Sequence, residues 1–264
     1  MMRNGITDAQ WSRFKEQGYV RLGPVLEPED LEAMQRRIDE IMMGTADVPY
    51  ERMLMQLDSV PGVSDQPGPQ SKGHKLATLS YRKIQDLEFD PLFLQYMQRP
   101  LFKHICERAY GLGTPVSSYR AMFMNKPAHE GTDLAWHQDR WTSLDRDPLI
   151  TIWTALDPAK VENGCMWVTP GRHHKLINPS DGSGFLTTEQ ADDLTEEFEV
   201  EPLTLEAGEA LLLHNHLPHR SGVNSTDIAR RAFSVCYMDA GTVSTENKEY
   251  ALLFGSGAMS PDDL

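Results

Sequence analysis

The first 115 residues combine hydrophobic residues at helical spacing with signals that begin and end helices. Thr7 is followed three residues later by Gln10, which is the pattern of a capping box, and Glu27 with Pro28 forms a second start signal. Glycines and prolines then mark the points where helices end. The four predicted helices lie in the ranges 7–18, 27–44, 90–99 and 100–111.

Residues 45–75 show no helical or strand periodicity. Prolines and glycines interrupt this segment at positions 49, 61, 62, 67, 68, 69 and 73. Such a composition predicts a loop, and loops of this length without secondary structure are unusual unless they serve a function. The segment is therefore a candidate lid over a site.

After residue 115 the pattern changes to short apolar runs of strand length, separated by Gly, Pro, Asn and Asp. These predicted strands are Ser118–Met124, Leu149–Leu156, Met166–Pro170, Ala210–Leu213 and Ala232–Tyr237. No long helices are predicted between them, so a barrel or jelly roll is favoured over a doubly wound sheet. We expect one domain over 1–264, mainly β with flanking helices: 1–115 mainly helix and loop, 116–240 the jelly-roll core.

The charge of the chain bears on its partners. It carries 39 acidic and 25 basic side chains, a formal net charge of −14. Nucleic acid and anionic lipid surfaces bind basic faces, so neither is expected as a partner. The expected partner is a small molecule. No signal peptide or membrane span is predicted, which favours a cytoplasmic protein. The three cysteines form no CxxC pair and are expected to be buried thiols.

His137 and Asp139 place an imidazole and a carboxylate two residues apart. On a strand, residues i and i+2 project from the same face, so both side chains can bind one ion. A second imidazole would complete two histidines and one carboxylate, an arrangement that leaves positions open on Fe(II). The candidates lie 75 to 80 residues downstream, at His214, His216 and His219, and spacing does not choose among them.

Two arginines begin the predicted strand that follows this histidine cluster. A 2-oxoacid that chelates iron through one end needs a cation for its distal carboxylate, and arginine pairs with carboxylates through two parallel hydrogen bonds. Successive strand residues face opposite ways, so only one of Arg230 and Arg231 points into a barrel and the other is expected to be solvated. The periodicity does not show which one faces inward.

Several short blocks along residues 83–230 occur in an order that carries a resemblance. They are Lys83-Ile84-Gln85-Asp86, Met122-Phe123-Met124-Asn125-Lys126-Pro127, His137-Gln138-Asp139, Trp153-Thr154-Ala155, Glu162-Asn163-Gly164-Cys165, Pro170-Gly171-Arg172-His173, and His219-Arg220-Ser221-Gly222-Val223-Asn224 followed by Arg230. In this order the blocks resemble the phytanoyl-CoA dioxygenase family of iron(II)- and 2-oxoglutarate-dependent oxygenases. The fold of that family is a double-stranded β-helix, or jelly roll, which agrees with the strand pattern.

The resemblance implies that His137, Asp139 and His219 are the catalytic iron ligands. It assigns Arg230 to the distal carboxylate of 2-oxoglutarate, which makes Arg231 the outward residue. The residues implied to contact this cosubstrate are Arg230, Ser221, Lys83, Trp153 and Met122. One departure, Gly171-Arg172-His173 in place of the family's usual Gly-Ser-His turn, involves no implied ligand.

The implied activity is hydroxylation of an unactivated C–H bond with Fe(II), 2-oxoglutarate and O2. Asp139 favours hydroxylation over halogenation, because halogenating relatives have a small residue in its place; desaturation and ring closure stay open. Two other classes are weighed. A zinc hydrolase accepts the same ligands but does not need Arg230. A non-catalytic jelly-roll binding module would be favoured by a lost ligand, and none is lost.

Three residues near the predicted metal segment are candidates for contact with the substrate. His129, Arg140 and Trp141 flank the predicted metal segment and are candidate substrate-binding residues. Arg140 is suited to an anionic group of a small substrate, and a surface pair with Asp145 or Asp147 is the alternative. The sequence carries no signal for the substrate's identity or for an oligomeric state.

Overall fold

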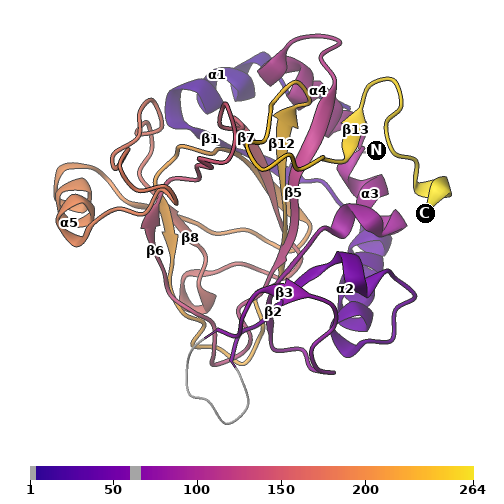
Figure 1. Ribbon diagram of the computed structural model, residues 1–264. Helices are drawn as coiled ribbons and strands as arrows, with labels where there is room; N and C mark the ends of the chain where they lie inside the picture. Colours follow the sequence, from indigo (N-terminus) through magenta and orange to yellow (C-terminus); the bar gives the residue numbers. More distant parts are fainter. Residues whose placement is uncertain (1–3, 60–66) are drawn as a thin grey trace.

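The computed structural model describes residues 4–59 and 67–264, which form two antiparallel sheets facing each other across the molecule (Figure 1). The strands of the large sheet are β1 (Tyr19–Pro24), β2 (Leu54–Leu57), β3 (Ser71–Lys72), β4 (Tyr81–Gln85), β5 (Val116–Met124), β7 (Ile150–Ala155), β10 (Glu209–His214), β12 (Ala232–Asp239) and β13 (Leu252–Phe254). The strands of the small sheet are β6 (Leu134–His137), β8 (Met166–Val168), β9 (Glu201–Leu203) and β11 (His219–Ser221). The large sheet has the order β1-β10-β7-β12-β5-β4-β2-β3 with β13 beside β5, and the small sheet has the order β6-β11-β8-β9. This is the predicted jelly roll.

The four predicted helices are confirmed, and a fifth was missed. The α-helices are α1 (Asp8–Gln17), α2 (Pro28–Met43), α3 (Pro91–Met97), α4 (Pro100–Tyr110) and α5 (Thr188–Glu197). Short 3-10 turns lie at Tyr50–Arg52, Leu87–Phe89, Val161–Asn163 and Pro261–Asp263. The sequence does carry a start signal for α5, because Thr187 and Gln190 form the same capping box as Thr7 and Gln10 do for α1.

The first 115 residues contribute more strand than predicted. β1 lies at one edge of the large sheet, while β4, β2 and β3 extend it beyond β5. The large sheet therefore also includes strands from before residue 116, although helices and loops make up most of the first 115 residues. The predicted loop at 45–75 is partly wrong, because β2 and β3 lie within it and pair with each other. Residues 60–66 of that candidate lid lie outside the described part of the chain.

Alternating side chains give the large sheet two different faces. Along β12, Phe233, Val235 and Tyr237 belong to the core beneath the helices, whereas Ser234 and Cys236 line a pocket between the sheets. Strand geometry explains the alternation, since successive side chains point to opposite faces. The outer face of the sheet is therefore a hydrophobic core, and the inner face is the wall of a cavity.

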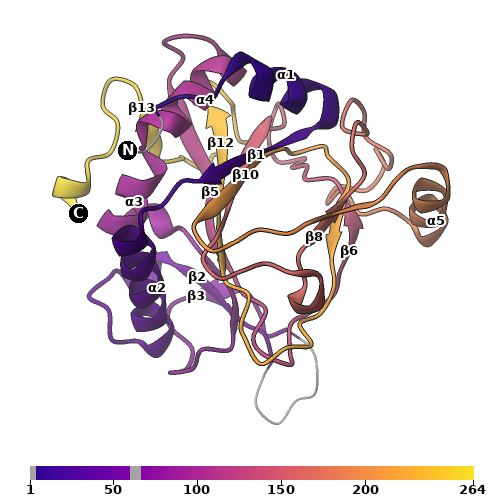
Figure 2. The ribbon, with the colours of Figure 1, turned by 180° about the vertical axis from the view of Figure 1, so that it is seen from behind.

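Helices α2, α3 and α4 cover the outer face of the large sheet, as both views show (Figures 1 and 2). Phe93 of α3 packs on Phe233 of β12 with ring centroids 4.8 Å apart. Tyr96, also on α3, hydrogen-bonds the hydroxyl of Thr154 on β7. This covering core holds the large sheet rigid, so the residues on its inner face have fixed positions.

The cysteines meet a further expectation from the sequence. Cys106, Cys165 and Cys236 are buried free thiols, as predicted. Among the helices that the structure describes, none is both long enough and apolar enough to span a membrane.

Arg231 points away from the cavity, but it is not solvated as expected. Its guanidinium lies 2.8 Å from an Asp157 carboxylate oxygen through Nε and 2.6 Å from Asp39 through Nη1. The Asp157 side chain is only 9% exposed, and it also accepts a hydrogen bond from the Arg231 backbone N–H. The ion pair joins the start of β12 to the end of β7 and to helix α2, so its role is structural.

We expect Arg231→Ala to destabilise the fold, because the buried carboxylate of Asp157 loses its cation. The expected loss is about 3 kcal/mol in the free energy of unfolding, which lowers Tm by roughly 5–10 °C. Thermal melting followed by circular dichroism measures it. The matched control is Arg36→Ala at an exposed position of α2, expected to change stability by less than about 0.5 kcal/mol. Equal melting of Arg231→Ala and the wild type would contradict this role.

Candidate functional site

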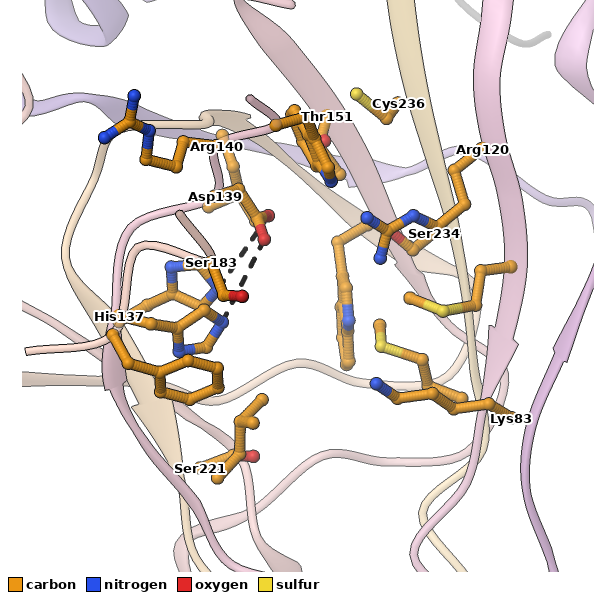
Figure 3. Close-up of a pocket in the computed structure, with 18 of the residues that line it drawn as sticks. Lys83, Arg120, His137, Asp139, Arg140, Thr151, Ser183, Ser221, Ser234 and Cys236 are labelled. Carbon is orange, nitrogen blue, oxygen red and sulfur yellow. Dashed lines mark ion pairs between the residues drawn. The ribbon is translucent and has the colours of Figure 1, made fainter. Parts of the chain in front are cut away.

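Two histidines and an aspartate converge on one point between the sheets (Figure 3). His137 ends β6 and His219 begins β11, and the two residues face each other in the register of these strands. The Nε2 atom of each ring lies 4.0 Å from a carboxylate oxygen of Asp139. The three ligand atoms lie within 4.8 Å of one another. His137, Asp139 and His219 are called the triad below.

Backbone hydrogen bonds fix which ring nitrogen each histidine presents. His137 Nδ1 lies 2.8 Å from the carbonyl oxygen of Ala135, and His219 Nδ1 lies 2.8 Å from that of Leu217. A carbonyl only accepts, so Nδ1 carries the proton and the neutral ring leaves a lone pair on Nε2. Both lone pairs therefore face the Asp139 carboxylate, as metal-binding imidazoles require.

The protonation states of the triad also suit a cation. Burial, together with the neighbouring His219 side chain, lowers the pKa of His137 to about 3. Burial alone would raise the pKa of Asp139, but the neighbouring histidines, Arg120 and Lys83 outweigh it, and the pKa lies below its usual value. A neutral imidazole beside an ionised carboxylate is the state in which a divalent metal ion binds.

Asp139 is positioned by hydrogen bonds rather than by a strand. β6 ends at His137, so the expected strand spacing of His137 and Asp139 is wrong in detail. The Asp139 N–H donates to the carbonyl of Asn215 at 2.7 Å. Gln138, which is buried, donates through its side-chain amide to the carbonyls of Lys175 and His216. These bonds hold the carboxylate beside the two rings.

Residues 178–186 form a loop packed closely over the triad. The Gln138 N–H donates to the carbonyl of Gly184, and a Cβ at Gly184 would lie 1.9 Å from the carbonyl oxygen of Gln138. Gly184 also has φ +77°, which favours glycine. Phe185 then stacks on the ring of His137, with ring centroids 5.1 Å apart. The loop thus covers one side of the triad with an aromatic ring.

His214 and His216 do not reach the triad. The His214 ring packs against Phe14 and His173. His216 Nε2 lies 3.2 Å from a carboxylate oxygen of Asp147. The structure therefore brings His219, and neither of the other two candidates, to His137 and Asp139.

The triad lies in a cavity of about 470 Å³, a size typical of small-molecule sites. All five residues implied to contact 2-oxoglutarate line this cavity: Lys83, Met122, Trp153, Ser221 and Arg230. Arg230 is 5% exposed, and its guanidinium carbon lies 5.5 Å from the centre of the Trp153 ring. Burial lowers the pKa of Arg230 to about 10, so the side chain is still a cation at neutral pH.

The buried Nε of Arg230 has no hydrogen-bond partner in the described part of the chain. A buried guanidinium without a partner is costly unless a ligand satisfies it. A carboxylate ligand does so, because it accepts two parallel hydrogen bonds and balances the charge. The cavity therefore offers a metal-binding triad together with a buried cation for an acidic cosubstrate.

Two of the three candidate substrate residues line the cavity, and the third lies elsewhere. Arg140 and Trp141 line the cavity. The guanidinium of Arg140 donates to the carbonyl of Pro179 at 2.6 Å, so it holds the loop over the triad and pairs with neither Asp145 nor Asp147. His129 is not among the residues lining this cavity, and its side chain pairs with Asp227 at an exposed position.

Sequence reasoning missed several residues on the inner face of the large sheet. The missed lining residues include Arg120, Thr151, Ser234 and Cys236. A signal was present, since each alternates with buried apolar residues in a predicted strand. Arg120 and Met122, for example, lie two positions apart on β5 and both face the cavity.

Comparisons with known proteins agree with this geometry. The chain is 29% identical to phytanoyl-CoA dioxygenase domain-containing protein 1 of Bos taurus, over 90% of this chain and 92% of that protein. It is 27% identical to a methylphosphonate hydroxylase of Gimesia maris, over 89% of this chain and 82% of that protein.

Solved structures share the fold. EctD from S. alaskensis with bound Fe has a TM-score of 0.70 at 17% identity, covering 92% of this chain and 79% of that one. The 2-oxoglutarate-dependent carbocyclase SnoK has a TM-score of 0.66 at 19% identity, covering 92% and 88%. A sequence model described as phytanoyl-CoA dioxygenase matches residues 14–232, and the chain therefore belongs to this family of non-haem iron- and 2-oxoglutarate-dependent oxygenases.

Proposed function

We propose that this oxygenase hydroxylates an unactivated C–H bond of a small-molecule metabolite. In the overall reaction, the substrate C–H, 2-oxoglutarate and O2 become the C–OH product, succinate and CO2. The observation that carries the proposal is the combination within one cavity: two histidine Nε2 atoms directed at Asp139, and a buried arginine without a partner. The 27% identity to a methylphosphonate hydroxylase supports hydroxylation as the outcome.

Different residues of the cavity have different roles in this reaction. His137, Asp139 and His219 would hold Fe(II), which supplies the oxidising chemistry when bound. Arg230 and Ser221 bind the distal carboxylate of 2-oxoglutarate, while Lys83, Met122 and Trp153 surround the cosubstrate. Phe185 beside His137 excludes water from one side of the triad, so that oxidation is directed at the substrate.

The alternatives weighed from the sequence fit the cavity less well. A zinc hydrolase would use the triad but would leave Arg230 buried without a partner. A binding module without catalysis would not need both histidines aligned on one carboxylate by backbone hydrogen bonds. Desaturation or ring closure would use the same residues, so analysis of the oxidised product by mass spectrometry decides among these outcomes.

The metal assignment is tested by anaerobic addition of Fe(II) and 2-oxoglutarate to the protein. We expect a weak visible charge-transfer band, because an iron ion with open positions is chelated by the 2-oxoacid. His137→Ala and His219→Ala should abolish the band, since each removes a ligand. The matched controls His214→Ala and His216→Ala should keep it. An undiminished band in the first two variants, with native circular dichroism, would place the metal elsewhere.

The cosubstrate assignment is tested by two adjacent arginines. Arg230→Ala should raise the KM for 2-oxoglutarate by about a hundredfold to a few thousandfold, since leaving a buried charge unpaired costs roughly 3–5 kcal/mol. Arg230→Lys should recover only part of this loss, because lysine lacks the two-pronged geometry. Arg231→Ala, assayed well below its melting temperature, should change the KM by less than about threefold, because its side chain faces Asp157. A larger effect at position 231 would reverse the assignment.

A further inference from the structure

A second cation faces the cavity from the end opposite to Arg230. Arg120 on β5 lies beside Cys236 of β12, and Cys236 is six residues further along the chain than Arg230. Six extended residues correspond to about 20 Å of backbone, so the two arginines enter the cavity from different positions along the large sheet. With Arg230 assigned to the distal carboxylate of 2-oxoglutarate, Arg120 is a second arginine in this wall without an assigned ligand.

The guanidinium of Arg120 is held by aromatic rings. Its central carbon lies 5.2 Å from the Trp141 ring centre and 5.6 Å from that of Tyr119. In Figure 3 the side chain extends from β5 into the cavity, toward the side where Asp139 lies. Stacking of this kind orients a guanidinium, and beyond the hydrogen bond of Arg120 with the Tyr119 hydroxyl its remaining N–H groups are available for an acceptor.

The charges around Arg120 also favour an anion. Lys83 on the adjacent strand β4 points into the same cavity (Figure 3). Among the described residues, no carboxylate forms an ion pair within 4 Å of Arg120 or Lys83. The acidic residue that interacts electrostatically with both side chains is Asp139. In the proposed function Asp139 binds the metal, Arg230 and Ser221 bind the distal carboxylate of the cosubstrate, and Lys83 lies beside the cosubstrate. Arg120 then remains a cation without a counter-ion.

Arg140, the anion-binding candidate from the sequence, is less available for this role. Its Nη1 already donates to the backbone carbonyls of residues 179 and 181, although its buried Nε has no partner in the described part of the chain. Arg120 has no comparable carbonyl partner among the described residues. Arg120 is therefore preferred to Arg140 as the anion contact.

We propose that Arg120 binds an acidic group of the substrate, which makes the substrate class a small carboxylic or phosphonic acid. The inference rests on the proposed function, since it assigns the second ligand of the same cavity. The neighbouring wall formed by Phe185 and the triad then receives the carbon end of the molecule. A C–H bond at that end of the molecule is thereby presented for oxidation.

Three matched pairs of probes test the proposal. Each pair joins an acid to a neutral analogue of similar shape: butyrate with butyramide, phenylacetate with phenylacetamide, and methylphosphonate with its dimethyl ester. Succinate release is measured with iron-loaded wild-type protein, 2-oxoglutarate and O2, and binding is measured anaerobically by calorimetry. We expect at least one acid to bind and to stimulate succinate release about tenfold more than its neutral partner. The pair that responds shows whether the group is a carboxylate or a phosphonate.

Arg120→Gln then tests the residue itself. The expected result is a ten- to hundredfold loss in kcat/KM and in affinity for the stimulating acid, with the KM for 2-oxoglutarate changed by less than about threefold. Arg120→Lys should recover part of the loss, and the matched control Arg36→Gln, at an exposed position of α2, should behave as the wild type. Circular dichroism confirms that each variant is folded.

Four results would overturn the inference. The first is equal stimulation of succinate release by an acid and its neutral partner, and the second is an undiminished response of Arg120→Gln to the acid. The third is a rise in the KM for 2-oxoglutarate in Arg120→Gln as large as its loss of affinity for the acid. The fourth is no stimulation by any acid in a protein that still converts 2-oxoglutarate slowly on its own. The last result leaves the proposed function intact. A protein that never converts 2-oxoglutarate, with or without probes, contradicts the proposed function instead.

Discussion

The pairing of β6 with β11 is the constraint on which the candidate site depends. It sets His137 directly opposite His219, and each ring is then locked by a hydrogen bond from Nδ1 to a carbonyl two residues earlier in the chain. A slip of one residue between these strands would turn one imidazole to the outer face of the sheet. The strands are only four and three residues long, so neighbouring segments must hold this register.

A buried polar network provides that support. Asn215 accepts the backbone hydrogen bond of Asp139, and its side-chain oxygen accepts a hydrogen bond from the hydroxyl of Thr151 on β7. Its side-chain amide donates to the carbonyl of Pro148. The position of the carboxylate is therefore linked directly to the large sheet, which is itself fixed by the helices behind it. Networks in which the buried groups find partners are rigid, because any displacement leaves a polar group unpaired.

The sequence predicted those parts of the fold that have strong local signals. Long apolar runs identified β5, β7, β10 and β12, and capping signals identified α1 to α4. The short strands β9 and β11 were missed, and the strand expected at the metal segment ends at His137 rather than continuing to Asp139. Long-range pairing stabilises them, and local propensity contributes little.

The candidate site shows the same limit. Spacing alone left three histidines open, since the choice depends on strand register, and the family resemblance singled out His219. The solvated Arg231 was a wrong expectation because its partners, Asp39 and Asp157, are distant in sequence. Arg120 was overlooked although it alternates with apolar residues, because alternation does not show which of the two faces of a strand lines a cavity.

The two sheets carry different chemistry, and this affects how the protein can change during evolution. The triad belongs to the small sheet and the segments next to it, whereas Arg120, Thr151 and Ser234 belong to the large sheet. Side chains on the inner face of the large sheet are backed by a separate hydrophobic core on its outer face. Point substitutions on that inner face, except at Thr151, whose hydroxyl bonds Asn215, therefore alter the shape and charge of the cavity without moving the metal-binding atoms. A few mutations can thus change the substrate preference, while the triad is inherited unchanged.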